Sequence, residues 1–200
     1  MKLHRHLAIL TALFGLFLAN ASAQPAATGG NPVEDLRTLF TKIQGKLQNG
    51  IVAEEALASD IAEATKLGDI LAVSFHWGVE YAHIPTARQT KLARLSIDAG
   101  ADIVIGSHPH VLQGIETYKD GLILYSLGNF VFDQIGSDEN ESLVVKFHWN
   151  ADGTRSFELV PMRIVGTFPR AATDAETEET IARIASWSPD PGPVRAGEVA

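Results

Sequence analysis

The sequence contains no cysteine among its 200 residues. This absence excludes disulfide bonds, thiolate metal ligands, a cysteine nucleophile and a lipid-modified cysteine. Positive charge is also scarce, because 16 Lys and Arg stand against 24 Asp and Glu and give a formal net charge of −8. Such an acidic chain is a poor partner for nucleic acids and anionic membrane surfaces. Any metal ion in this protein must therefore be held by His, Asp, Glu or Asn side chains.

Several catalytic signatures are missing as well. The sequence has no Gly-x-Ser-x-Gly elbow, no phosphate-binding glycine loop and no His-Glu-x-x-His motif. These motifs mark serine hydrolases, nucleotide-hydrolysing enzymes and the common zinc peptidases, respectively. Their absence argues against these three classes of enzyme.

The amino-terminal apolar run, residues 7–19, is shorter than the roughly 20 residues that a membrane-spanning helix needs. It follows the basic residues Lys2 and Arg5 and precedes the small-residue sequence Ala21-Ser22-Ala23. This order predicts a cleaved secretory signal peptide over residues 1–23, and hence export to the periplasm or the extracellular space. An uncleaved membrane anchor is the alternative interpretation. After cleavage we expect no integral membrane span.

The next part of the chain predicts alternating helices and strands. Residues 24–50 predict a Pro/Gly/Ala-rich spacer followed by a short helix. The main domain is expected over residues 51–168 and begins with a helix at 51–67. Two continuous apolar runs, 70–75 and 101–105, predict buried strands, and a helix is expected between Pro85 and Gly100. The order strand, helix, strand predicts a right-handed βαβ unit in a parallel sheet, so the fold class is α/β.

The second part of the domain predicts antiparallel structure. The sequence Lys119-Asp120-Gly121 separates two short strands and is typical of a hairpin turn. Alternating apolar residues over 143–149 predict a half-buried strand, and residues 157–165 predict its return strand, where Pro161 marks a bulge or a sheet edge. The carboxyl-terminal segment, 169–200, is expected to form an acidic helix at 173–186 and a disordered Pro-rich tail.

Three histidines follow the two predicted parallel strands. His76 ends the first strand, and His108 and His110 follow the second in the sequence Gly106-Ser107-His108-Pro109-His110. Because the carboxyl ends of parallel strands lie at one edge of a sheet, we expect the three imidazoles on the same rim. Imidazole is the commonest protein metal ligand, so these residues are candidates for holding Zn, Mn or Fe. A loop with exposed histidines and no ion is the alternative.

Two further residues complete the candidate catalytic set. Asn129 follows a glycine at a strand break, where its amide could bind a metal or a substrate oxygen, or could simply form a turn. Glu80 could orient a ligating histidine through a hydrogen bond, or could be a solvated loop acid. Glu116 and Asp133 are weaker candidates. We expect His83 to be an exposed loop residue, and His148 to lie on the polar side of its strand without binding metal.

Three segments resemble, in order and spacing, the later motifs of CapA-type poly-γ-glutamate capsule synthesis proteins. They are His76-Trp77-Gly78-Val79-Glu80-Tyr81, Gly106-Ser107-His108-Pro109-His110-Val111 and Tyr125-Ser126-Leu127-Gly128-Asn129-Phe130-Val131-Phe132. Those proteins are similar to calcineurin-like metallophosphatases. The resemblance runs from about residue 56 to about residue 165. It implies a four-layer α/β sandwich of two mixed sheets with a dinuclear metal site, in which His76, His108 and His110 would be the late metal ligands.

The sequence departs from this family pattern in its first part. The family's acidic Gly-Asp motif, its Asn/Glu motif and its Asn-Asn-His motif are not found, and Gly68-Asp69 precedes its strand instead of following one. The resemblance therefore implies the carboxyl half of a metallophosphatase-like domain, with the amino-terminal half and its bridging carboxylate missing.

These observations predict a CapA-family protein of capsule or poly-γ-glutamate biosynthesis with an incomplete metal-dependent hydrolase site. Its substrate would be a phosphoester or an amide in a cell-envelope polymer, and capsule-assembly proteins would be its partners. Whether the site is active stays open, because the implied carboxylates are missing. The alternatives are a non-catalytic envelope protein that binds polymer or partners, and a truncated inactive fragment.

Overall fold

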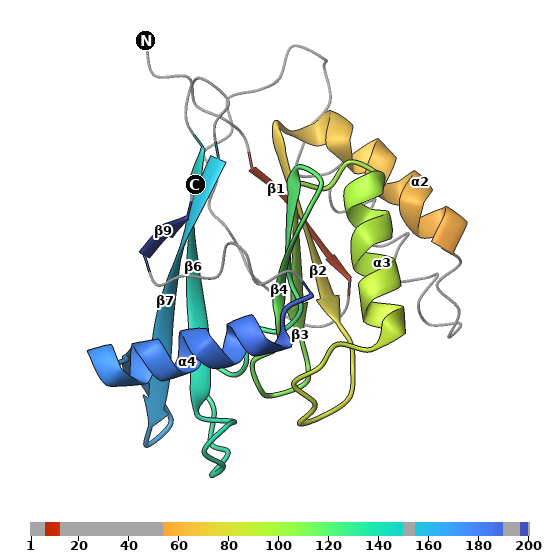
Figure 1. Ribbon diagram of the computed structural model, residues 1–200. Helices are drawn as coiled ribbons and strands as arrows, with labels where there is room; N and C mark the ends of the chain where they lie inside the picture. Colours follow the sequence, from red (N-terminus) through yellow and green to blue (C-terminus); the bar gives the residue numbers. More distant parts are fainter. Residues whose placement is uncertain (1–6, 13–53, 150–154, 190–196, 200) are drawn as a thin grey trace.

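The computed structural model describes residues 7–12, 54–149, 155–189 and 197–199. Two β-sheets form adjacent layers, and two helices cover the other face of the first sheet (Figure 1). The fold is therefore an α/β sandwich, as the sequence predicts. No helix among the described residues is long and apolar enough to cross a membrane.

The first sheet contains the predicted βαβ unit. Its strands lie in the order β1-β2-β3-β5-β4. β2 (Ile70–His76) and β3 (Ile103–Ser107) pair in parallel, and α3 (Ala87–Asp98) connects them. β5 (Gly121–Leu124) continues the sheet in parallel, and β4 (Ile115–Tyr118) pairs with β5 as the predicted hairpin. β1 (Leu7–Ala12) lies parallel to β2 at the other edge.

The helix layer buries one face of this sheet. α2 (Glu54–Ala64), the short 3₁₀ helix Thr65–Leu67 that continues it, and α3 form this layer. α3 begins at a capping box in which Thr86 Oγ1 accepts a hydrogen bond from Gln89 N, and Gln89 Oε1 accepts one from Thr86 N. Ile61 of α2 and Val104 of β3 are fully buried between the two layers. Burial of the central strands on both faces explains their continuous apolar runs.

The second sheet is antiparallel. Its strands β6 (Glu141–Trp149), β7 (Arg155–Val165) and β8 (Phe168–Ala171) lie in this order, and β9 (Gly197–Val199) also pairs with β7. α4 (Asp174–Trp187) crosses one end of the sandwich and contacts both β7 and β4 (Figure 1). Leu124, Leu159 and Ile184 bury their side chains between the two sheets and α4.

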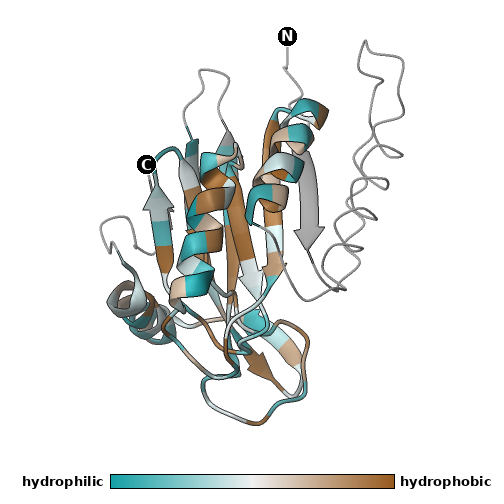
Figure 2. Cartoon of the chain, turned by 90° about the vertical axis from the view of Figure 1, so that its right-hand side faces the viewer, coloured by the Kyte–Doolittle hydropathy of each residue, from teal (hydrophilic) through white to brown (hydrophobic). Residues whose placement is uncertain are grey.

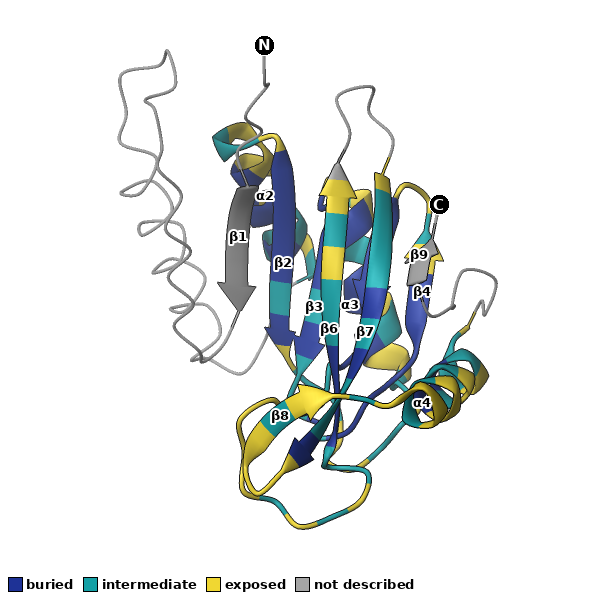
Figure 3. Cartoon of the chain, turned by 90° about the vertical axis from the view of Figure 1, so that its left-hand side faces the viewer, coloured by how far each residue is buried: buried dark blue, intermediate teal, exposed yellow. Residues whose placement is uncertain are grey.

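The described residues differ in two respects from the four-layer sandwich that the resemblance implies. The second sheet is antiparallel instead of mixed, and no helix layer covers its outer face within the described part of the chain (Figure 3). From Val145 to His148, side chains along β6 alternate between half-buried and exposed. This alternation is typical of a strand that faces solvent on one side.

Several predictions concern the two ends of the chain. Leu7–Ala12, within the predicted signal peptide, forms β1 and pairs in parallel with β2. The rest of the predicted signal peptide and the spacer and helix at 24–50 lie outside the described residues, so cleavage stays a prediction. In the predicted tail, Gly197–Val199 is a strand, and residues 190–196 and 200 lie outside the described residues.

Pro161 does not lie at a bulge, so that part of the prediction is wrong, but it does lie at a local edge of the sheet, where neither β8 nor β9 pairs with β7. It occupies β7, the middle strand of the second sheet, in unbroken register opposite Leu143 of β6. The oxygen of Pro161 accepts a hydrogen bond from Ala172 N at 3.0 Å, and Ala172 directly follows the last residue of β8. Because β8 ends there, the strand tolerates a residue that has no N–H to donate.

Candidate metal site

The three predicted histidines meet at the carboxyl end of the first sheet. His76 is the last residue of β2 and pairs in register with Ser107, the last residue of β3. His108 and His110 follow directly in the loop after β3. The ring centroids of His76 and His108 are 4.5 Å apart, and those of His108 and His110 are 6.0 Å apart. The parallel pairing of β2 and β3 thus places the three imidazoles side by side.

The turn that carries His108 and His110 has an energetically costly backbone. The φ angle is +99° at His108 and +62° at His110, in the left-handed region that residues other than glycine rarely adopt. Pro109 O accepts a hydrogen bond from Tyr81 N at 2.8 Å, and Ser107 Oγ donates one to a β2 carbonyl at 3.1 Å. These bonds to the β2 side hold the turn in place, so the two imidazoles have preset positions.

Asn129 determines which nitrogen of His110 is free to bind a ligand. The amide nitrogen of this buried side chain donates to two backbone carbonyls, His110 O at 3.3 Å and Glu139 O at 3.1 Å. The amide oxygen therefore faces the ring, and Asn129 Oδ1 lies 2.9 Å from His110 Nδ1. An amide oxygen only accepts hydrogen bonds, so Nδ1 carries the hydrogen and the lone pair of the neutral ring is on Nε2. Asn129 thus orients His110.

Glu80 brings a carboxylate to the two neighbouring histidines. The ligand atoms that Glu80, His108 and His110 offer all lie within 4.8 Å of one another. Imidazole and carboxylate donors suit Zn, Mn or Fe, and bonds of about 2.0–2.1 Å require the ligand atoms to lie about 3–4 Å apart. The Glu80 side chain is exposed on the loop after β2. In chemical type this donor set therefore fits one divalent ion.

His76 stands beside this set. Its side chain is largely exposed, but its ring packs against that of His108. The resulting partial desolvation, followed by repulsion from His108 and His110, lowers the pKa of His76 below its ordinary value of 6.5. At neutral pH the ring of His76 is therefore neutral, and one of its nitrogens has a lone pair for an ion or a proton.

Two residues that sequence reasoning does not single out join the loops of the site. Tyr81 OH accepts a hydrogen bond from Gln134 Nε2 at 3.2 Å, and Gln134 Oε1 accepts one from Asn129 Nδ2 at 3.0 Å. These bonds connect the loop after β2 with the loop after β5. Tyr81 closes the first of the three motifs, which is a signal that could have found it, whereas nothing in the sequence around Gln134 marks that residue.

Exposed apolar side chains surround the histidines on the same two loops. Figure 2 shows hydrophobic residues along the loops at this end of the molecule. The Phe132 ring lies 5.2 Å from the ring of His110. The apolar residues are between 39% and 97% exposed and comprise Val79, Tyr81, Ile84, Phe130, Val131, Phe132 and Ile135. The approach to the imidazoles is thus lined by apolar surface.

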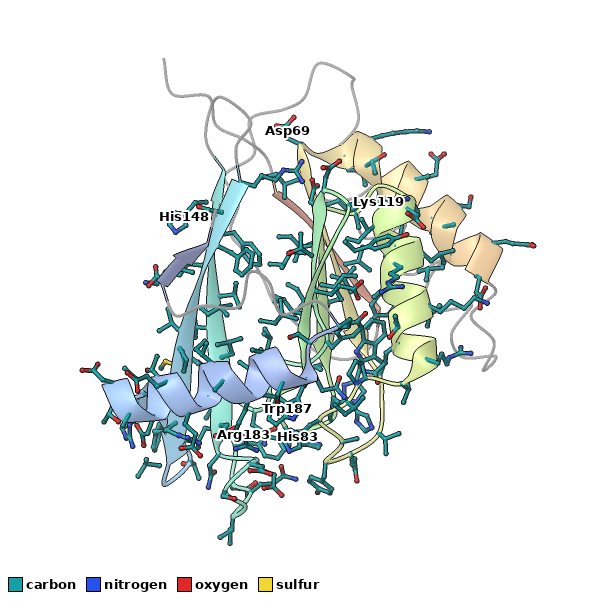
Figure 4. All side chains as sticks on the ribbon, viewed as in Figure 1. Asp69, His83, Lys119, His148, Arg183 and Trp187 are labelled. Atoms are coloured by element: carbon teal, nitrogen blue, oxygen red, sulfur yellow. The ribbon has the colours of Figure 1, made fainter. Side chains whose placement is uncertain are left out.

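The two weaker candidates, Glu116 and Asp133, lie apart from the cluster of ligand atoms, and so does His148, for which no metal is predicted. Glu116 is buried, pairs with Arg94 at 2.7 Å and accepts a hydrogen bond from Tyr125 OH at 2.6 Å. These contacts give Glu116 a role in the core. Asp133 is exposed and does not belong to the cluster of close ligand atoms. His148 is exposed on β6, toward the far end of the second sheet (Figure 4).

His83 is not the exposed loop residue that the sequence predicts. Its Nδ1 lies 2.9 Å from Leu112 O, its Nε2 lies 3.1 Å from Asp138 Oδ2, and its ring stacks on that of Trp187 with centroids 4.1 Å apart (Figure 4). The guanidinium carbon of Arg183 lies 4.9 Å from the centre of the Trp187 ring. His83 therefore joins the loop after β2 to α4, a contact that depends on tertiary packing.

A mixed sheet with imidazoles and a carboxylate at the ends of its parallel strands defines an α/β protein with a candidate metal site. The family comparison assigns the chain more closely: the family model described as "Bacterial capsule synthesis protein PGA_cap" matches residues 7–134, and the chain belongs to this family. All three quoted motifs lie within the matched residues.

Several curated proteins are similar in sequence to part of this chain. The chain is 47% identical over 124 residues to the PGA biosynthesis protein CapA of Bacillus subtilis (strain 168). This match covers 62% of this chain and 33% of the relative. It is 44% identical over 115 residues to the capsule biosynthesis protein CapA of Bacillus anthracis, covering 58% of this chain and 28% of the relative. A probable polyglutamine synthesis accessory protein of Mycobacterium tuberculosis (strain ATCC 25618 / H37Rv) is 32% identical over 144 residues, covering 66% and 38%. The matched part of the chain thus spans about a third of the length of each relative.

Proposed function

We propose that this chain acts in the biosynthesis of capsular poly-γ-glutamate or a related cell-envelope polymer, as a metal-dependent hydrolase. Membership of the capsule synthesis family and the names of the Bacillus relatives support the process. The observation that carries the hydrolase assignment is the cluster of imidazole and carboxylate ligand atoms at the carboxyl end of the first sheet. If the predicted signal peptide exports the chain, the proposed reaction takes place outside the cytoplasm.

In this proposal His76, His108 and His110 hold a divalent Mn, Zn or Fe ion. When bound, such an ion lowers the pKa of a coordinated water molecule and polarises a phosphoryl or acyl oxygen. The residues of the chain supply position and protonation state. Asn129 keeps Nε2 of His110 free of hydrogen, and the lowered pKa of His76 keeps its ring neutral at neutral pH. The substrate would be a phosphoester or an amide bond of the polymer.

The test is hydrolysis by the purified full chain. Metal content is measured first, followed by the release of product from p-nitrophenyl phosphate and from poly-γ-glutamate with added Mn²⁺ or Zn²⁺. Removal of a residue that merely orients a metal ligand lowers activity by about 10- to 100-fold, so we expect His108→Ala to lower the rate by at least about 100-fold. A protein that binds no divalent ion and hydrolyses neither substrate would refute the proposal.

Two further variants make this test independent of folding. His148→Ala removes an exposed imidazole of β6 and should leave the rate unchanged. His76→Ala removes a candidate ligand at an exposed strand end, where the backbone has no positive φ, and should lower the rate as His108→Ala does. Thermal unfolding of each variant shows whether the fold is retained, and a cooperative transition of the unchanged chain excludes a fragment that cannot fold by itself.

A second candidate function is binding of envelope polymer or partner proteins without catalysis. The exposed apolar side chains on the loops after β2 and β5 favour it, because exposed apolar residues that gather on one side of a protein mark interaction sites. This function requires no intact imidazole cluster. Cells that carry His108→Ala would then form capsule like cells that carry the unchanged protein, whereas the hydrolase proposal expects capsule to be altered.

A further inference from the structure

We propose that Glu80 is a direct ligand of the metal ion, together with His108 and His110. This inference rests on the proposed function, because both require a bound divalent ion. The sequence interpretation gives Glu80 a hydrogen bond to a histidine, but no such bond is present among the described residues. Instead, the carboxylate and the two imidazoles offer ligand atoms that all lie within 4.8 Å of one another.

The backbone around Glu80 holds this residue opposite the two imidazoles. Trp77 N donates to Ser107 O at 3.0 Å, and Tyr81 N donates to Pro109 O at 2.8 Å. The second bond joins the residue after Glu80 to the residue between the two histidines. Tyr81 has a φ of +63°, so the chain turns directly after Glu80. The position of Glu80 is therefore set by the same contacts that hold the turn with the histidines.

Charge gives the carboxylate a reason to bind the ion. Neutral imidazoles leave the charge of a divalent cation uncompensated, and one carboxylate offsets half of it. Two histidines and one carboxylate form a recurrent ligand set that leaves open positions for water or substrate. Among the described residues Glu80 forms no ion pair with Lys or Arg, and the groups that share its cluster are the imidazoles of His108 and His110.

The test uses the absence of cysteine from the chain. Glu80→Cys introduces the single thiol of the protein, and a thiolate that binds Co²⁺ directly gives a sulfur-to-cobalt charge-transfer band in the near ultraviolet. Asp133→Cys places a thiol at an exposed acidic position of the loop after β5 and is the matched control. We expect the band with Glu80→Cys and none with Asp133→Cys. A residue that only positioned a histidine would give no band.

Affinity provides the second measurement. Glu80→Gln keeps the shape of the side chain and removes its charge, and we expect it to weaken binding of Zn²⁺ and Mn²⁺ in calorimetric titration by at least about tenfold. Asp133→Asn removes the same charge nearby and should bind as the unchanged chain does. Urea unfolding without metal verifies that these exposed substitutions leave the fold intact.

The outcomes separate this inference from the proposed function. If the unchanged chain binds the ion but Glu80→Cys saturates with Co²⁺ without the band, Glu80 is not a ligand and the hydrolase proposal stands. The same conclusion follows if Glu80→Gln binds Zn²⁺ as tightly as the unchanged chain. If the unchanged chain binds none of the three ions, the proposed metal-dependent function and the ligand assignment both fail.

Discussion

Replacement of Asn129 by Asp tests whether this side chain orients His110. The two side chains have nearly the same shape, but Asp presents an oxygen where Asn129 presents its amide nitrogen. That nitrogen donates to His110 O at 3.3 Å, Glu139 O at 3.1 Å and Gln134 Oε1 at 3.0 Å. Gln134 can turn its own amide toward the new oxygen, whereas the two backbone carbonyls cannot. Asn129→Asp therefore leaves two carbonyls of a buried site facing a carboxylate.

The expected loss of stability follows from these contacts. A buried acceptor that loses its donor costs about 1–3 kcal/mol, so two carbonyls cost about 2–6 kcal/mol. The new charge strengthens the hydrogen bond with His110 Nδ1 and offsets about 1 kcal/mol of this cost. We expect the free energy of unfolding to fall by about 3 kcal/mol, which corresponds to a decrease in melting temperature of roughly 6–12 °C for a chain of this size.

Urea unfolding followed by circular dichroism measures this change. Asn140→Asp is the control, because it adds the same charge at a half-buried position where the described hydrogen bonds involve only the backbone. If Asn129→Asp and Asn140→Asp differ by less than about 1 kcal/mol, the amide of Asn129 is not fixed by the two carbonyls. The assignment of Nε2 as the free nitrogen of His110 would then lose its basis.

Three further predictions concern the fold around the site. A Cβ on Gly106 would lie 1.9 Å from Tyr125 O, so Gly106→Ala should lower the free energy of unfolding by about 3 kcal/mol or more. Gly166 has a φ of +54° and a Cβ there would meet no heavy atom within 4 Å, so Gly166→Ala should lower it by only about 1 kcal/mol. Urea unfolding compares the two variants. Tyr125→Phe removes the donor to buried Glu116 and should cost about 1–3 kcal/mol in the same assay. Arg183, followed by His83, lowers the pKa of Asp138 below its ordinary value of 3.8, so the stability that this carboxylate contributes is present above that value and lost as the pH falls through the lowered pKa. Unfolding midpoints measured from about pH 6 downward should fall less steeply for Asp138→Asn than for the unchanged chain, and equal slopes would contradict this linkage.

The sequence predicts the features that depend on residues close together in the chain and misses those that depend on contacts between distant segments. The βαβ unit, the hairpin at Lys119-Asp120-Gly121 and the helix α4 are predicted from local apolar periodicity and turn residues. The exposure of His83 is mispredicted, because it depends on where α4 packs, and the choice between a bulge and an edge at Pro161 depends on where β8 ends. Neither position is encoded near the residue itself, so no local pattern could reveal it.

At the site itself, the sequence alone determined that three imidazoles share one rim, because strands that pair in parallel bring their carboxyl ends to the same edge of a sheet. Only the tertiary structure decided that Asn129 orients His110 and that the carboxylate of Glu80 joins His108 and His110. Both contacts join loops that follow different strands of the sheet. Their geometry is set by long-range packing and by backbone hydrogen bonds such as that from Tyr81 to Pro109, which have no signature in local sequence.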